Sequence, residues 1–437
     1  MTRLSERLQQ PRLLAPWCVL AAFGTYACMY GFRKPFTAGS YDGGEGLGDF
    51  DLKALLVTSQ VLGYSLSKII GIKVVSEMAA ANRARAILLL IGIAHLALLG
   101  FALTPAPWGA AFLFLNGLPL GMVFGLVLGF LEGRRLTELF VAGQCASFIL
   151  ADGFTKSVGR GLLEAGVPEH WMPFTAGLVF LAPLLGFVWM LQHIPAPTDA
   201  DMDARSKRTP MTARDRFAML RRHGWALVMI LIAYLLITIL RSLRADFAPE
   251  IWAGLGVDAR PAMFTISEFW VALGIVLANG FLVMIRSNTR ALFTALVTSL
   301  LGLLTAGFAI LGVSRGSLSP FAFMVLLGFG LYVPYVAVHT TIFERLVALT
   351  RERGNIGFLM YVADSVGYLA YAALTLSPGL LAPDAGGVRG AEFVRGFLDL
   401  SGVLLIGTAV AFTLSALIYG RRHRSGTWDV RSGTRST

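Results

Sequence analysis

Long apolar segments recur along the whole chain, and they constrain its fold more than any other feature. Twelve segments approach or exceed the roughly 20 residues that an α-helix needs to cross the hydrocarbon of a bilayer. They lie at residues 13–36, 50–75, 84–104, 107–131, 139–162, 171–193, 224–250, 261–285, 290–313, 318–344, 354–379 and 396–420. The pattern predicts an all-α membrane protein with twelve transmembrane helices, so we expect the lipid bilayer to be its surroundings.

The composition agrees with this fold class. Of 437 residues, 56% are hydrophobic and 14% are charged, whereas a soluble domain carries roughly 25% charged residues. The net charge of +11 is typical of basic cytoplasmic loops in a membrane protein rather than of a nucleic-acid partner. Cys18, Cys28 and Cys145 all lie in apolar segments without metal-ligand spacing. We therefore expect no metal and no cofactor.

Lys and Arg gather in alternate connections, which indicates the orientation of the chain. The positive-inside rule places such connections in the cytoplasm. They carry Arg3, Arg7, Arg12, Lys73, Arg83, Arg85, Arg134, Arg135, Arg286, Arg290, Arg345, Arg351, Arg353, Arg421, Arg422 and Arg424. Both termini are thus expected in the cytoplasm, with the protein in a bacterial inner membrane. The first apolar segment is long for a signal peptide and is expected to remain as a helix.

A long polar stretch divides the segments into two sets of six. We expect an N-terminal bundle at 1–193, a cytoplasmic linker at 194–223, a C-terminal bundle at 224–420 and a cytoplasmic tail at 421–437. An offset of 208 residues aligns Trp17 with Trp225, Tyr26 with Tyr234, Arg33 with Arg241, and Gln60 with Glu268. Two pseudo-symmetric six-helix bundles, with a solute site between them near the membrane midplane, are the organisation of the major facilitator fold.

Arg241 is the most informative charge inside these segments. It lies past the middle of the seventh segment, and Arg33 takes the matching place in the first. An isolated guanidinium at that depth would cost several kcal/mol, so each should face a partner or a cavity. One alternative is an ion pair of Arg241 with Asp246 or another intramembrane acid. The other is a bound anion, because guanidinium donors match phosphate or carboxylate oxygens in pairs.

Two lysines are further candidates for the solute site. Lys34 points about 100° away from Arg33 on a helix, so it either lines the same cavity or reaches the membrane surface. Lys68, inside the second segment, either adds positive charge to the cavity or pairs with an acid. Arg244 lies three residues after Arg241, nearer the outer surface, and is expected at the rim of the cavity.

Polar rings inside the segments complete the candidate ligands. His339 is expected to be hydrogen-bonded structure or to handle substrate or protons. Tyr30 and Tyr335 either present hydroxyl groups to a polar ligand or pack against neighbouring helices. His95 has no charged neighbours in sequence and is expected to be structural.

The intramembrane acids are candidates for ion pairs or for proton coupling. Asp152 and Lys156 are four residues apart and can neutralise each other on one helix face. Glu268 is expected to counter Lys68, Arg33 or Arg241, or to carry a coupling proton, and Asp364 has the same alternatives.

Motifs for enzyme chemistry are missing from the sequence. There is no Walker A loop, no HExxH, no GxSxG and no cysteine pair with metal spacing, so we expect neither an enzyme nor an ATP-driven pump.

Four short segments resemble the organophosphate:phosphate antiporter family of the major facilitator superfamily. YGFRKPF (30–36) and LLITILRSLRADFAPEIW (235–252) are similar to its first-helix and seventh-helix signatures, GYSLSKIIG (63–71) to a second-helix segment, and ISEFWVALG (266–274) to an eighth-helix segment with an acid. The resemblance implies that Arg33 and Arg241 bind phosphate. It also maps Lys68, Asp246 and Glu268 onto positions of the family.

The sequence departs from this family at two places. The usual Asp-Arg pair after the second helix is replaced by SEMAAANRAR (76–85), and the fifth helix, with GQCASFILADGFTKSVG (143–159), lacks the His of glycerol-phosphate members. The organic part of a substrate is therefore left open.

The sequence as a whole predicts a secondary transporter that exchanges a phosphate ester, or another small anionic solute, for inorganic phosphate by alternating access. One alternative is proton-coupled transport of another solute such as a carboxylate, with Glu268 or Asp364 carrying the proton. Another is a transporter-like membrane sensor that binds a ligand and signals to a partner.

Overall fold

The computed structural model describes residues 10–42, 46–47, 51–131, 137–195, 224–285, 287–350, 356–377 and 390–424. Within these ranges the regular structure is helical and contains no strand. Ten helical segments are long and apolar enough to cross a membrane, and α7 and α17 bring the membrane-length segments to twelve. Most of the predicted linker, from 196 to 223, and the tail beyond 424 lie outside the described residues.

The first half of the chain makes six crossings. Its helices are α2 (Pro11–Gly31), α3 (Leu52–Glu77), α4 (Arg83–Leu103), α5 (Gly109–Leu120), α6 (Val123–Leu131), α7 (Thr137–Glu164) and α8 (Met172–Gln192). Helices α5 and α6 together form one span, Gly109–Leu131. Pro119 near the end of α5 removes one backbone donor, which explains why the helix is interrupted there.

The second half repeats this pattern of six crossings. Its elements are α11 (Trp225–Asp246), α12 (Ala248–Gly254), α13 (Pro261–Val283), α14 (Asn288–Ser314), α15 (Pro320–Ala337), the π-helix η3 (Val338–Ile342), α16 (Phe343–Thr350), α17 (Ile356–Thr375) and α18 (Ala391–Arg424). The π-turn joins α15 to α16, and one apolar span, Pro320–Leu346, covers all three elements.

The first helix is shorter than its apolar segment predicts. The segment 13–36 suggested a helix that includes Arg33 and Lys34, but α2 ends at Gly31, and the two residues form a turn before the 3₁₀-helix η1 (Pro35–Ala38). Pro35 is the cause, because the residue before a proline is disfavoured in the α-region and the proline has no N–H to continue the ladder.

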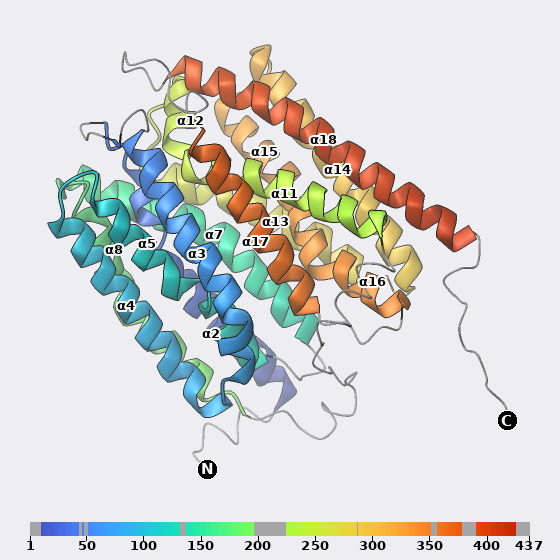
Figure 1. Ribbon diagram of the computed structural model, residues 1–437, viewed down its shortest axis with the longest axis horizontal. Helices are drawn as coiled ribbons and strands as arrows, with labels where there is room; N and C mark the ends of the chain where they lie inside the picture. The colour runs from blue at the N-terminus through green and yellow to red at the C-terminus, as the bar shows by residue number, and fades with distance from the viewer. Residues whose placement is uncertain are drawn as a thin grey trace.

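The two halves meet along two pairs of helices, seen in the middle of Figure 1. Helix α3 packs against α17, and α7 packs against α13. The second crossing of each half thus faces the fifth crossing of the other, as expected when two parallel repeats are related by an axis along the membrane normal. Helices α4 and α8 lie at one outer edge and α18 at the other.

The outer helices expose apolar side chains, whereas charges are buried between the halves. Leu89 and Leu96 of α4 and Leu304 and Phe308 of α14 are largely exposed in the isolated chain. Apolar surface of this extent marks contact with lipid. The inner face of α3 instead buries Lys53 and Lys68.

Small residues let neighbouring helices approach closely. A Cβ added to Gly117 of α5 would overlap the backbone of α3, and one added to Gly63 of α3 would overlap the backbone of α5. Gly302 of α14 and Gly330 of α15 meet in the same way. Close backbone packing of this kind substitutes for hydrophobic driving force inside a bilayer.

Candidate functional site

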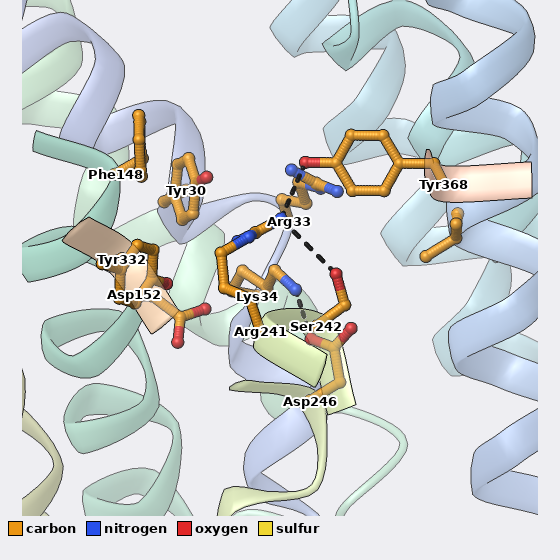
Figure 2. Close-up of a pocket in the computed structure, with 11 residues that line it drawn as sticks. Tyr30, Arg33, Lys34, Phe148, Asp152, Arg241, Ser242, Asp246, Tyr332 and Tyr368 are labelled. Atoms are coloured by element: carbon orange, nitrogen blue, oxygen red, sulfur yellow. Dashed lines mark hydrogen bonds and ion pairs between the residues drawn. The ribbon is translucent and has the colours of Figure 1, made fainter. Parts of the chain in front are cut away.

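Two adjoining narrow cavities lie between the halves. The first cavity, drawn in Figure 2, is lined by Tyr30, Arg33, Lys34, Val61, Phe148, Asp152, Arg241, Ser242, Asp246, Tyr332 and Tyr368. The second cavity is lined by Tyr26, Tyr30, Tyr64, Lys68, Phe124, Phe148, Arg241, Tyr335, His339, Asp364 and Tyr368. Every candidate substrate ligand predicted from sequence lines one cavity or both, although the candidates come from helices far apart in the chain.

Arg33 enters the first cavity from the N-terminal half. Its side chain is buried, and its guanidinium carbon lies 3.6 Å from the centre of the Tyr64 ring. Cation–π contact with a desolvated ring stabilises the charge. The Nε of Arg33 has no hydrogen-bond acceptor among the described residues, so part of its donor capacity is unused.

Two amide side chains hold the turn that carries Arg33. Gln60 of α3 donates to the carbonyl of Arg33 at 2.8 Å, and Asn116 of α5 donates to the carbonyl of Phe32 at 3.0 Å and receives a bond from Gln60. A helix end leaves carbonyls without partners, and buried carbonyls require them. Neither Gln60 nor Asn116 was predicted from sequence as a positioning residue. An amide side chain inside an apolar segment is the signal that could have identified them.

Arg241 enters the same cavity from the C-terminal half, as Figure 2 shows. Its guanidinium carbon lies 4.5 Å from the centre of the Tyr335 ring, and Nη2 donates to the hydroxyl of Tyr368 at 3.2 Å. Its Nε, like that of Arg33, has no acceptor among the described residues. The two arginines predicted as pseudo-symmetric partners therefore face one cavity.

Ion pairs account for all other buried charges of the described residues. Seven basic and five acidic side chains are buried there. The pairs are Lys34 with Asp246, Lys53 with Glu250, Lys68 with Asp364, Lys156 with Asp152, and Arg244 with Glu268. Among the described residues Arg33 and Arg241 are left without a carboxylate, so the region of the cavities carries two positive charges that no described acid compensates.

These pairs decide between alternatives that the sequence left open. Asp246 pairs with Lys34, and the other four buried acids of the described residues also pair with cations other than Arg241, so no ion pair accounts for Arg241 there. Lys68 pairs with an acid, Asp364, at 2.7 Å. The predicted pair of Asp152 and Lys156 is present.

Two expectations about charges are wrong. Arg244 was expected at the rim, but it is fully buried and donates to Glu268 at 2.8 Å and to the carbonyl of Met324. Glu268 accordingly neutralises Arg244 and not Lys68, Arg33 or Arg241. The physical reason is that Glu268 of α13 and the carbonyl of Met324 on α15 lie within reach of Arg244, so its charge is neutralised between helices instead of reaching the membrane surface.

His339 belongs to a hydrogen-bonded network at the second cavity. Its Nε2 bonds to the hydroxyl of Tyr234, which donates to Asp364, and Lys68 donates to the other oxygen of Asp364. His339 lies in the π-helix η3, a local structure that is frequent at functional sites. The network links α3, α11, η3 and α17, and only Tyr234 was missed as a polar partner.

Two more contributions to the site were not predicted from the sequence. Lys53 pairs with Glu250 of α12 across the halves, although its place near a segment end resembled a surface anchor. Tyr368 lines both cavities, and its spacing of four residues from Asp364 on one helix face was the signal available. His95, expected to be structural, stacks on Phe174 with ring centres 4.5 Å apart.

Metal-binding geometry is not found in the described part of the chain, which holds no cluster of three or more His, Cys, Asp or Glu side chains suited to an ion. The arrangement can bind an anion at Arg33 and Arg241 and can pass protons among Tyr234, His339 and Asp364.

Solved transporters share this fold. A D-xylose–proton symporter aligns with a TM-score of 0.58 and 12% identity over 90% of this chain and 96% of its own. A bacterial homologue of the human drug peptide transporters PepT1 and PepT2 aligns with a TM-score of 0.62 and 12% identity, over 94% of this chain and 98% of its own. A bacterial homologue of the human lysosomal transporter Spinster, in an inward-facing and unoccupied conformation, aligns with a TM-score of 0.55 and 15% identity, over 96% of this chain and 99% of its own.

These likenesses confirm the predicted major facilitator fold of an integral membrane protein. Among curated proteins none matches the sequence significantly. One family model, described as "Family of unknown function (DUF5690)", matches residues 35–422. Since this match covers most of the chain, the protein belongs to that family of unknown function, DUF5690.

Proposed function

We propose that the protein is a secondary transporter that exchanges a phosphate ester for inorganic phosphate by alternating access of the central site. The observation that carries this proposal is the pair of buried guanidinium groups, Arg33 and Arg241, which alone among the buried charges of the described residues have no carboxylate partner. The major facilitator fold supports transport, because it is shared with the transporters named above.

The charge of the ligand follows from the charge of the site. Two uncompensated cations facing one cavity repel each other and are costly away from water. A phosphate monoester carries about −1.5 to −2 charges at pH 7, which matches the two cations. Each guanidinium can also donate two parallel hydrogen bonds to a phosphate. The similarity of YGFRKPF (30–36) and of residues 235–252 to the antiporter signatures supports phosphate over carboxylate.

Alternating access requires the halves to rock about this site. Among the described residues, three buried ion pairs join the halves in the present conformation: Lys34 with Asp246, Lys53 with Glu250, and Lys68 with Asp364. A dianion held by one arginine from each half screens their repulsion and lowers the barrier to closure. An empty site keeps the repulsion, and this makes exchange more favourable than one-way transport.

The remaining assignments complete the proposal. Lys34 and Lys68 hold the halves together when the site is empty and add positive potential when their acids are turned away. Tyr30 and Tyr335 border the anion, and Asp152 with Lys156 supports the first cavity. The segment 194–223 is assigned as the linker that connects the halves. The protein is assigned to a bacterial inner membrane, with both termini in the cytoplasm.

The test is exchange in proteoliposomes loaded with unlabelled phosphate, with uptake of labelled phosphate as the readout. Arg33→Gln and Arg241→Gln are each expected to reduce uptake at least about 100-fold, since one lost charge-assisted pair is worth about 1.5–3 kcal/mol and the remaining cation cannot hold the dianion alone. Arg315→Gln, a change in an exposed loop, is the matched control and is expected to keep full uptake. Full exchange in Arg241→Gln would refute the assignment.

A second candidate function is proton-coupled transport of another solute, and one observation favours it. The hydrogen-bonded chain of Tyr234, His339 and Asp364 connects an imidazole ring to a carboxylate at the second cavity, which suits proton transfer. Uptake driven by an imposed pH gradient, with no counter-anion inside the vesicles, would support this function. Uptake that needs internal phosphate and ignores the gradient would exclude it.

A further inference from the structure

The second cavity differs from the first in the chemistry of its walls. Seven of the eleven residues that line it are aromatic, and no Ser, Thr, Asn or Gln of the described chain is among them. Ligand pockets lined in this way bind apolar bodies and use a few polar groups for orientation. Arg241 lines both cavities, so an anionic group bound there can carry an attached organic group into the second cavity.

The polar groups that Lys68, His339, Asp364 and Tyr368 bring to the second cavity are already engaged. Lys68 donates to Asp364 at 2.7 Å, Tyr234 bonds to both His339 and Asp364, and the hydroxyl of Tyr368 accepts from Arg241. A polyol placed here would exchange water for tyrosine hydroxyls, without amide or free carboxylate partners, so several of its hydroxyls would stay unsatisfied. The cavity therefore disfavours a sugar or glycerol body.

The rings are arranged to accept another ring. Phe148 of α7 and Tyr335 of α15 lie edge to face, with centres 5.8 Å apart and planes at 90°. Tyr64 of α3 and Tyr368 of α17 do the same at 5.5 Å and 79°. Each pair has one ring from each half of the protein, so separation of the halves on one side opens edges and faces that a flat ligand can occupy with the geometry aromatic pairs prefer.

Resting on the proposed function, we infer that the organic part of the substrate is an aromatic ring, so that the substrate class is aromatic phosphate monoesters. The phosphate lies between Arg33 and Arg241, and the ring lies in the second cavity among Tyr64, Phe148 and Tyr335. This assignment names the part of the substrate that the sequence left open.

Calorimetry on the purified full chain tests the inference with five probes of similar charge: phenyl phosphate, cyclohexyl phosphate, glycerol 3-phosphate, glucose 6-phosphate and inorganic phosphate. Phenyl phosphate is expected to bind at least about 10-fold more tightly than either polyol ester, with cyclohexyl phosphate between them, because edge-to-face contact adds to apolar burial. A polyol ester that binds as tightly as phenyl phosphate overturns the inference.

A variant tests the location of the ring. In Phe148→Leu, which keeps an apolar side chain, the affinity ratio of phenyl phosphate to inorganic phosphate is expected to fall about 3- to 10-fold. Phe281→Leu is the matched control on the outer surface, where Phe281 is 72% exposed, and its ratio is expected to stay that of the wild type. An unchanged ratio in Phe148→Leu overturns the assignment of the ring to this cavity.

The outcomes separate the two proposals. If inorganic phosphate binds and Arg33→Gln abolishes this binding, but phenyl phosphate has no advantage, only the aromatic substrate class is refuted. If neither inorganic phosphate nor any ester binds, the proposed function and the inference are both refuted.

Discussion

The pair of Lys68 and Asp364 offers the sharpest test of the charge arrangement. Nζ and Oδ2 lie 2.7 Å apart, and both side chains are buried. Removing one partner of such a pair leaves an uncompensated charge and costs about 3–5 kcal/mol. Lys68→Met is expected to lower the free energy of unfolding by about 3 kcal/mol, because Tyr234 and His339 still contact Asp364. Asp364→Asn is expected to lower the free energy of unfolding by about 5 kcal/mol. Among the described residues Lys68 would then have only the weaker Asn oxygen and the faces of rings such as Tyr64, whose centre lies 5.3 Å from Nζ.

The double variant separates loss of charge balance from loss of packing. Lys68→Met combined with Asp364→Asn removes both charges, so its destabilisation is expected to stay within about 1.5 kcal/mol. The coupling energy of this double-mutant cycle is then about 6.5 kcal/mol or more, which is the sum of the two single losses less the loss in the double variant. Unfolding by SDS in mixed micelles measures the free energy of unfolding of the wild type, the two single variants and the double variant. Glu164→Gln, which breaks an exposed pair with Arg160 at 3.6 Å, is the control and is expected to change stability by less than about 0.5 kcal/mol.

The reasoning is refuted if each single variant costs less than about 1 kcal/mol, or if the double variant is as unstable as the sum of the two. Either result would mean that water or lipid headgroups already compensate these charges and that the surplus assigned to the two arginines is not real.

Three further predictions concern packing, rocking and anion binding. Gly117→Ala is expected to destabilise by about 1–3 kcal/mol, since the added Cβ overlaps the backbone of α3; Gly307→Ala, with nothing within 4 Å, is expected to gain up to about 1 kcal/mol, as melting curves of both will show. The hydroxyls of Thr58 and Thr375 lie 2.6 Å apart across the halves, so a disulfide in Thr58→Cys/Thr375→Cys is expected to stop exchange until it is reduced; undiminished exchange by the crosslinked protein would contradict rocking. Arg241→Lys keeps the charge but loses the planar fork, and its phosphate affinity by calorimetry is expected to fall at least about 10-fold; wild-type affinity would argue against paired hydrogen bonds.

Sequence periodicity predicted the fold because lipid imposes one dominant constraint. Every crossing must satisfy its own backbone hydrogen bonds, so apolar length alone reveals each helix. The boundaries were less certain where local chemistry intervened: Pro35 ends α2 before Arg33, and the crossing at 318–344 contains a π-turn around His339. Neither deviation changes the hydropathy of its segment.

The members of the site were also accessible from sequence, since a charge inside an apolar segment is costly and must have a use. The offset of 208 residues related Arg33 to Arg241, and both line the first cavity. A lysine inside a span, such as Lys68, likewise indicated a buried role without naming its partner.

Only the tertiary structure decided which charges neutralise each other. Lys34 meets Asp246 and Lys68 meets Asp364 across the halves, over separations of 212 and 296 residues. A single sequence gives the number of buried cations and acids, but the energy of each charge depends on the few ångströms to its nearest opposite charge, which helix packing sets. The sequence thus determined twelve crossings and a surplus of positive charge, and the packing of α3 on α17 and of α7 on α13 placed that surplus on Arg33 and Arg241.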